Sequence, residues 1–255
     1  MPHLKIISYY IINNTIKVIN EFLFLILANF LKKTSLNKEI KMIVVDIETS
    51  GLDFNKCGIW QIGAIDFDNP NNTFLEDARI DDEDFFQDGA GKVSGKTEKE
   101  MRDSNKQSQK QLLEHFFSWF ESAKTKNFIC ENPQFDWGFI TTKAIKYELR
   151  PPYHHRCFDL HSIASLKYFQ INNRFLIKDG RSDLSLPNTL KFCGIEDPRR
   201  KVEGNEVLKE GKPHNALEDC RLEAECFSRL VYGKGLFPEY AEFPVPDYLK
   251  KKEEK

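Results

Sequence analysis

"MIVVDIET", residues 42–49, is a run of β-branched residues with two carboxylates near its end, and it decides the fold of this chain. Such a run predicts a buried strand. "GIWQIGAIDFD", residues 58–68, and "NNTFLEDARI", residues 71–80, repeat the pattern, with turn residues at 69–72 between them. Three consecutive strands with short connections predict an antiparallel meander.

Alternating helix and strand patterns follow the meander. Apolar positions from Leu112 to Phe120 recur at helical spacing, so a core-facing helix is predicted at 108–123. Residues 81–107 are polar and predict a loop with at most a short helix at 97–103. The other predicted elements are a strand at 127–130, a helix after Asn132, a strand at 155–158, a helix at 159–169, a loop, a helix ending at Gly194, a basic loop and a helix at 216–232. This order predicts an α/β fold: a mixed β-sheet, antiparallel in its first three strands, flanked by α-helices.

Composition limits the class of protein. The chain has 255 residues, of which 40% are hydrophobic and 21 are Phe, which is enough apolar material for one globular core. A formal net charge of -2 excludes a global basic field, so a nucleic-acid partner would be held by local patches or bound metal. Six irregularly spaced cysteines without a C-x-x-C pair predict reduced thiols and a cytoplasmic protein.

We divide the chain into residues 1–41, residues 42–233 and a Pro- and aromatic-rich, then charged tail at 234–255. The longest apolar run of the first part, Phe22 to Leu31, is shorter than the roughly 20 residues of a membrane span, and no small-residue cleavage site follows it. Residues of AT-rich codons dominate this part, so we expect translation to start at Met42 rather than Met1. If residues 1–41 are genuine, the alternative is an amphipathic helix that binds a membrane surface or a partner; otherwise no membrane contact is expected.

Four carboxylates and one histidine form the candidate site. Asp46 and Glu48 are two apart on the first strand and therefore point to the same face. With Asn132 as N-cap and Pro133 at the first helical position, Asp136 falls in the first turn of its helix. A metal-bound reaction centre is one explanation of these positions, and a first-turn Asp favoured by the helix dipole is the alternative.

"PHNALEDC", residues 213–220, repeats this arrangement at the last helix. Asn215 is a predicted N-cap, with Glu218 as its capping-box partner. Asp219 then occupies the fourth helical position, and His214 precedes the cap. These two positions normally hold an apolar pair in contact, so we expect His214 and Asp219 to lie together.

Four carboxylates carry about four negative charges, which two divalent cations would balance. Two oxygen-liganded ions roughly 4 Å apart form the type of site that hydrolyses phosphodiesters. An imidazole with a pKa near 6.5 is suited to take the proton from the attacking water, which predicts His214 as the general base.

"DIETSG" at 46–51, "NPQFD" at 132–136 and "HNALED" at 214–219 resemble, in this order, the motifs of the DEDDh (DnaQ-like) 3′–5′ exonuclease family of the ribonuclease-H-like superfamily. The resemblance covers residues 42–233 and implies a ribonuclease-H-like fold and release of nucleoside 5′-monophosphates from a 3′ end. It implies two Mg²⁺ ions, with Mn²⁺ as a substitute, held by Asp46, Glu48, Asp136 and Asp219, with His214 as base. The substrate-binding residues that it implies are Thr49, Ser50, Gly51, Leu52 and Asn132, with Gly51 allowing close backbone approach. Glu131 and Pro133 depart from the family pattern.

The expected partner is single-stranded or 3′-frayed nucleic acid, and the motifs leave DNA and RNA both open. The alternative function is a binding subunit with little catalysis, which would contact a DNA polymerase or another protein through the aromatic tail; a homodimer is a further candidate. Basic segments at 178–181 and 199–201 are either steering charges for a phosphate backbone or solvated loops.

Overall fold

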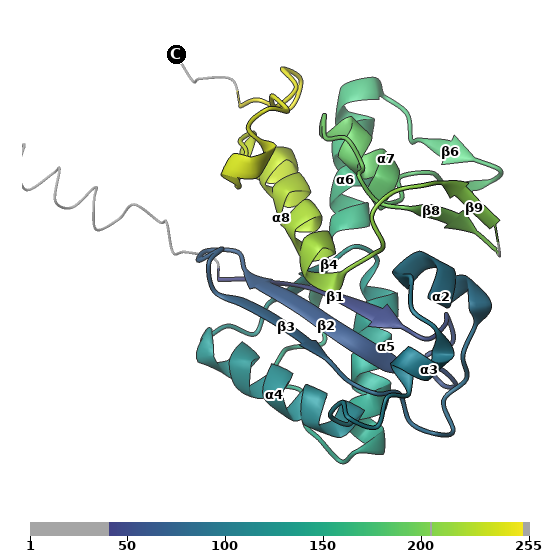
Figure 1. Ribbon diagram of the computed structural model, residues 1–255. Helices are drawn as coiled ribbons and strands as arrows, with labels where there is room; N and C mark the ends of the chain where they lie inside the picture. The colour runs from purple at the N-terminus through teal and green to yellow at the C-terminus, as the bar shows by residue number, and fades with distance from the viewer. Residues whose placement is uncertain (1–40, 205, 252–255) are drawn as a thin grey trace, which may run out of the picture. The chain divides into compact units, whose positions relative to one another are not determined.

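The computed structural model describes residues 41–204 and 206–251, so the predictions for residues 1–40 lie outside the described chain. Within this part, five strands form one sheet in the order β3-β2-β1-β4-β5 (Figure 1). The strands are β1 (Ile43–Thr49), β2 (Ile59–Asp66), β3 (Thr73–Asp77), β4 (Phe128–Cys130) and β5 (Cys157–Asp159). β1 pairs antiparallel with β2 and parallel with β4, while β2–β3 is antiparallel and β4–β5 parallel. The predicted mixed sheet with an antiparallel start is therefore confirmed.

Helices cover both faces of the sheet. The longer ones are α4 (Gln109–Ser122), α5 (Pro133–Lys146), α6 (Leu160–Asn172), α7 (Leu186–Phe192) and α8 (Ala216–Tyr232). Alternate residues of β1 separate the two cores: Val45 joins the α4–α5 core, and Val44 joins the core of α6, α7 and α8. Asp46 and Glu48 have the parity of Val44, so they face α8. None of the described helices has the length and apolar character to cross a bilayer.

Three elements were predicted as loops, and this prediction was wrong. The structure contains α2 (Asp88–Ser94), the ribbon of β6 (Ile177–Lys178) with β7 (Arg181–Ser182), and the ribbon of β8 (Lys201–Glu203) with β9 (Glu206–Lys209). α2 includes two glycines, which are poor helix formers. One of them, Gly91, is required by packing, because a Cβ there would lie 2.7 Å from the Phe86 ring. The predicted short helix at 97–103 is present as α3 (Glu98–Met101).

Both predicted N-caps occupy the expected positions, but their side chains act differently. Asn215 accepts hydrogen bonds from the backbone N–H groups of Leu217 and Glu218. The expected reciprocal bond from Glu218 is replaced by an ion pair, 4.0 Å, with Lys212. Asn132 makes no side-chain cap and instead has φ 57°, a left-handed conformation that Asn tolerates. It turns the chain sharply from β4 into α5.

The first turn of α8 lies directly on β2 at Gly63. A Cβ there would stand 2.3 Å from the carbonyl carbon of Ala216 and 2.4 Å from the amide nitrogen of Leu217. The amide of Ala216 also donates to Oε1 of the buried Gln61, 2.9 Å. Because Gly63 is paired with Asp46 in the sheet, this contact sets α8 against the acidic strand.

The tail after Gly233 packs on α8 and α7. The buried Glu225 carboxylate pairs with Arg229 and accepts the backbone N–H groups of Leu236 and Phe237. Phe237 and Leu249 are buried in the α6–α8 core. A 3₁₀ helix, η1 (Pro238–Tyr240), lies between them in sequence.

We predict that Gly63→Ala moves the first turn of α8 and costs about 1–3 kcal/mol of stability, as overpacking does. Urea unfolding measures this loss. Gly138→Ala is the matched control, since its Cβ would meet the nearest Phe54 atom at 3.4 Å, an ordinary contact. Equal stability of the two variants would show that α8 does not depend on this close approach.

Candidate active site

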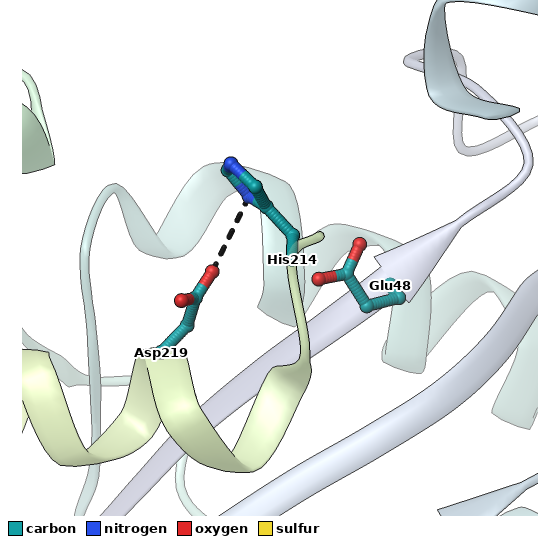
Figure 2. Close-up of side chains that lie close together, drawn as sticks. All are labelled: Glu48, His214 and Asp219. Carbon is teal, nitrogen blue, oxygen red and sulfur yellow. Dashed lines mark ion pairs between the residues drawn. The ribbon is translucent and has the colours of Figure 1, made fainter. Parts of the chain in front are cut away.

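Glu48, His214 and Asp219 form the centre of the site. One possible ligand atom from each lies within 4.8 Å of the others, and this is the single such group of three among the residues that the structure describes. Glu48 comes from β1, Asp219 from the first turn of α8, and His214 from the residue before its cap (Figure 2). His214 Nδ1 is 3.4 Å from Asp219 Oδ2. The predicted contact between these two residues is thus present.

Asp46 and Asp136 stand beside this group. Asp46 lines the same cavity as Glu48, whereas Asp136 is buried and accepts a hydrogen bond, 3.1 Å, from the backbone N–H of Ile47 through Oδ1. That bond attaches the first turn of α5 to β1. The structure therefore brings all four predicted carboxylates to one end of the sheet, although the ligand atoms of Asp46 and Asp136 lie outside the group of three.

The pKa values of Asp46, Glu48 and Asp136 are all raised. Burial, followed by the charge of Asp219, raises the pKa values of Asp46 and Glu48 well above their ordinary range. Burial also raises the pKa of Asp136 to about 7. Low-dielectric surroundings and mutual repulsion thus favour the protonated acids, so the site attracts either protons or cations.

Arg199 supplies part of the missing positive charge. Its buried guanidinium pairs with both oxygens of Asp197, at 2.9 and 3.0 Å, and with Asp219 Oδ2, at 3.1 Å. The sequence left two alternatives for Arg199, a steering charge or part of a solvated loop. Both are wrong for this residue, because its side chain is buried. Its side chain faces inward because two carboxylates surround it, and it holds Asp219 in one orientation.

His214 is oriented by the same segment. Its Nε2 lies 3.0 Å from the carbonyl oxygen of Arg200, and its backbone N–H donates to Val93 of α2 at 3.2 Å. A carbonyl oxygen only accepts, so this contact favours the tautomer with the proton on Nε2. Nδ1, which faces Asp219, is then the basic nitrogen.

The donor set fits a divalent cation. Asp219 Oδ2 is taken by Arg199, but Oδ1 is buried and has no hydrogen-bond partner in the described part of the chain. A buried carboxylate oxygen left in this way is costly unless something binds it. Together with the Glu48 carboxylate, this oxygen supplies the hard oxygen ligands that Mg²⁺ prefers.

A cavity of about 710 Å³ opens over these residues. Of the predicted substrate-binding residues, Thr49, Gly51 and Leu52 line it, whereas Ser50 and Asn132 do not. Ser50 is fully buried, and its hydroxyl donates to the carbonyl of Phe85 at 2.7 Å. Gly51 is required by protein packing as well, since a Cβ would lie 2.6 Å from Cys57 Sγ and 2.7 Å from Gln87.

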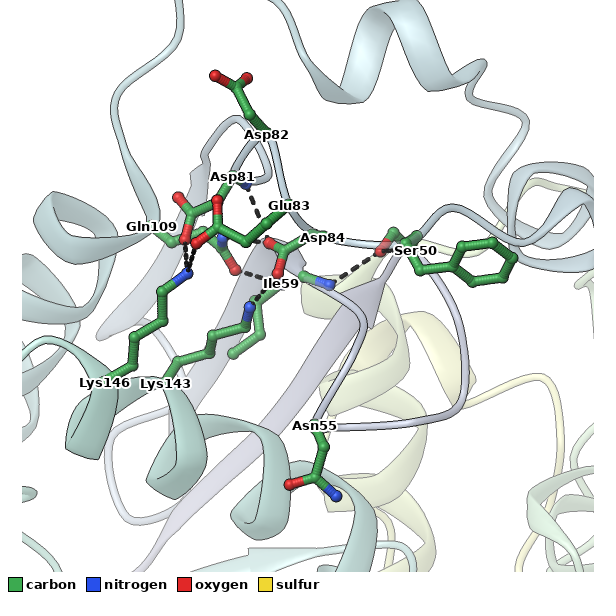
Figure 3. Close-up of polar contacts among 12 residues, drawn as sticks. Ser50, Asn55, Ile59, Asp81, Asp82, Glu83, Asp84, Gln109, Lys143 and Lys146 are labelled. Carbon is green, nitrogen blue, oxygen red and sulfur yellow. Dashed lines mark hydrogen bonds and ion pairs between the residues drawn. The ribbon is translucent and has the colours of Figure 1, made fainter.

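The opposite wall of the cavity comes from residues 85–90 and α2, which the sequence interpretation treated as loop. Gln87 accepts from the N–H of Leu52 at 2.9 Å and donates its own N–H to Ser50. Figure 3 shows how the acidic run before this wall is fixed: buried Asp84 pairs with buried Lys143 of α5 and accepts from Gln109. The wall is therefore tied to the helix that carries Asp136.

Two further acids lie near the site. Glu223, one turn after Asp219 on α8, is buried, and burial and then the charge of Asp136 raise its pKa. Burial, followed by the charges of Asp159 and Asp136, raises the pKa of Glu131 to about 8. The sequence analysis missed Glu223, although its i+4 spacing from Asp219 places it on the same helix face.

Stability of the metal-free protein should fall as the pH rises. The folded pKa of Asp136, about 7, exceeds the value of about 4 in an unfolded chain, so between these values the folded state binds the extra proton. Stability then declines through this window as pH increases. We predict that Asp136→Asn reduces the decline in Tm between pH 5 and pH 8, measured in EDTA. Exposed Asp82→Asn should keep the full decline, and the same decline in both variants would contradict the assignment.

Arg199→Gln leaves the Asp197 and Asp219 carboxylates without their cation. Removing one partner of a buried pair costs about 3–5 kcal/mol, and we predict a loss of this order by urea unfolding in EDTA. Arg150→Gln is the control, because Arg150 is exposed and substitutions of such surface residues change stability by about 0.5 kcal/mol or less. If both variants lost the same small amount, Arg199 would not be the counterion of Asp219.

Known proteins share this architecture. The structure of cell-death related nuclease 4 (CRN-4) matches with a TM-score of 0.56 and 15% identity, over 77% of this chain and 65% of that one. Apo exonuclease I matches with a TM-score of 0.56 and 18% identity, over 76% of this chain and 42% of that one. E. coli exonuclease I in complex with a dA16 oligonucleotide gives 0.55 and 18%, over 76% and 41%.

This chain therefore spans less than two thirds of each of these proteins. At identities of 15–18%, these structural matches show a shared fold alone. No curated protein matches the chain. The RNase T family model, described as "Exonuclease", matches residues 43–227, which include all three predicted motifs. The chain belongs to this DnaQ-like exonuclease family of the ribonuclease-H-like superfamily.

Proposed function

We propose that this chain is a metal-dependent 3′–5′ exonuclease, with residues 42–233 as its exonuclease domain and residues 234–255 as a tail. One observation carries the proposal: Glu48, His214 and Asp219, from segments far apart in sequence, meet within 4.8 Å at a cavity large enough for a nucleotide. The exonuclease family match supports it.

We propose two divalent cations, Mg²⁺ with Mn²⁺ as a substitute, as the cofactors. Asp46, Glu48, Asp136 and Asp219 would hold them, and the unpartnered Oδ1 of Asp219 supports this assignment. When bound, the cations stabilise charge on the attacked phosphate and lower the pKa of a water. Burial, together with repulsion between neighbouring carboxylates, raises the pKa values of Asp46, Glu48 and Asp136, and a bound cation would offset both effects.

His214 acts as the general base in this proposal. Its Nδ1 takes a proton from the attacking water, and the Asp219 carboxylate 3.4 Å away stabilises the resulting imidazolium. The carbonyl of Arg200 holds Nε2–H and so fixes the ring for this transfer. Hydrolysis then breaks the bond between phosphorus and the 3′ oxygen, which leaves a nucleoside 5′-monophosphate.

The terminal nucleotide would bind in the cavity. Leu52 and Phe85 line it with exposed side chains, 76% and 58% accessible, and such apolar surfaces pack on bases of any sequence. Thr49 and Gly51 complete this side of the cavity. Ser50 and Asn132 act in this proposal by holding the backbone that surrounds the nucleotide, since neither lines the cavity.

Single-stranded or 3′-frayed nucleic acid is the proposed partner. Exonuclease I, a structural neighbour, has been solved in complex with a dA16 oligonucleotide, which supports this class of ligand. All six cysteines are free, in keeping with a cytoplasmic location. No observation favours a polymerase contact or a homodimer, so neither is proposed.

The test is hydrolysis of 5′-labelled single-stranded DNA and RNA with Mg²⁺, Mn²⁺ or EDTA. We expect a metal-dependent ladder that shortens from the 3′ end. Asp46→Ala should abolish it, and His214→Ala should slow it by about 10²–10⁴-fold, the usual contribution of general base catalysis. His115→Ala, an exposed histidine on α4, is the control and should retain full activity. A protein that binds these strands without shortening either would be a binding subunit instead.

A further inference from the structure

An exposed surface outside the active site combines apolar and basic side chains. It consists of the second half of α6 and the β6–β7 ribbon, residues 166–182, which we call the α6–ribbon surface. Its apolar members are Leu166, Phe169, Phe175 and Ile177, which are 38–58% accessible. Its exposed cations are Arg174, Lys178 and Arg181. None of these three has an ion-pair or hydrogen-bond partner for its side chain in the described structure.

The rings of Phe169 and Phe175 form a solvent-exposed stack. Their centroids are 4.8 Å apart at an interplanar angle of 30°. An aromatic pair normally gains stability by removal from water, yet both rings retain more than a third of their accessible surface. Exposed aromatic faces of this kind are the platforms on which single-stranded bases stack.

The ribbon places two positive charges opposite each other. Lys178 and Arg181 are cross-strand partners, although like charges in this position destabilise a β pair. Residues 166–182 contain the cations Lys167, Arg174, Lys178 and Arg181 against the single anion Asp179, in a chain of net charge -2. An anion bound between Lys178 and Arg181 would offset their repulsion. The backbone of a nucleic acid supplies such anions at regular spacing.

This surface is connected to the active site by α6. The helix starts at Leu160. In its first turn, His161 Nδ1 lies 3.6 Å from Glu131. Glu131 directly follows β4 and precedes Asp136 by five residues. Nine helical residues separate Leu160 from Phe169, a rise of about 14 Å. In Figure 1 the β6–β7 ribbon and the β8–β9 ribbon, whose residues line the cavity, extend to the same side of the molecule.

We propose that the α6–ribbon surface binds the part of a single-stranded nucleic acid that lies upstream of the nucleotide being removed. Arg174, Lys178 and Arg181 contact its phosphates, and Phe169 and Phe175 stack on its bases. The direction of the strand rests on the proposed function, whereas binding to this surface does not. The surface gives longer strands tighter binding than strands that fill only the cavity.

The test compares a strand that reaches the surface with one that does not. The triple variant Arg174→Glu, Lys178→Glu, Arg181→Glu should bind a fluorescent 16-nucleotide strand at least tenfold more weakly in EDTA. The slope of log affinity against log salt should become shallower by about 2, since each phosphate contact on a single strand contributes about 0.7. Hydrolysis of a trinucleotide should be unchanged. Phe169→Ala with Phe175→Ala should weaken 16-nucleotide binding without changing the salt slope.

The control variant carries the same change of charge elsewhere. Lys110→Glu, Lys126→Glu and Arg150→Glu alter three exposed cations outside this surface, and binding should be retained. Unchanged affinity and salt slope in the first triple variant would overturn the proposal, as would an equal loss in the control. If the phenylalanine variant instead converted a dimer to a monomer at unchanged affinity, a second copy would be the occupant. A wild-type protein that binds through this surface but hydrolyses nothing would refute only the proposed function.

Discussion

The close approach of α8 to β2 at Gly63 is the contact on which the rest of the site depends. At this point the backbone of Ala216 and Leu217 occupies the space that any side chain would need. The Ala216 N–H is satisfied by Gln61, so the start of the helix is held by a hydrogen bond as well as by packing. Because Asp219 and His214 are close to this point in the chain, the same contact places them beside the carboxylates of β1.

Bringing these carboxylates together costs electrostatic free energy, and a cation and a backbone N–H group offset part of it. Arg199 pairs with one oxygen of Asp219, and the N–H of Ile47 donates to Asp136. Burial, followed by the charge of Asp219, still raises the pKa values of Asp46 and Glu48. Buried Glu223, one turn after Asp219 on α8, also contributes to the raised pKa of Asp46. Bound cations would balance this charge, which is the physical basis for the proposed metal-dependent chemistry.

The segment between α7 and α8 links the parts of the site. Arg199 contacts Asp219, the carbonyl of Arg200 holds His214, and an Arg200 guanidinium nitrogen donates to the carbonyl of Lys92 in α2. The β8–β9 ribbon that follows contributes Val202 and Gly204 to the cavity. A change in how this ribbon packs on α2 would thus alter both Asp219, the proposed metal ligand, and His214, the proposed base. The sequence predicted only a basic loop for this segment, because its apolar residues follow neither helical nor strand periodicity.

The sequence by itself predicted the antiparallel pairing of the first three strands, the core helix at 108–123 and the meeting of four carboxylates with His214 at one end of the sheet. These follow from local rules: alternation along β1, helical spacing, and the positions of Asn215 and Asn132 before their helices. The tertiary structure alone decided that α2 is a helix, that Arg199 faces inward and that Ser50 supports the cavity wall from behind. Each of these depends on partners distant in sequence, such as Asp219 for Arg199 and Phe85 for Ser50, because burial and ion pairing arise only when those segments meet.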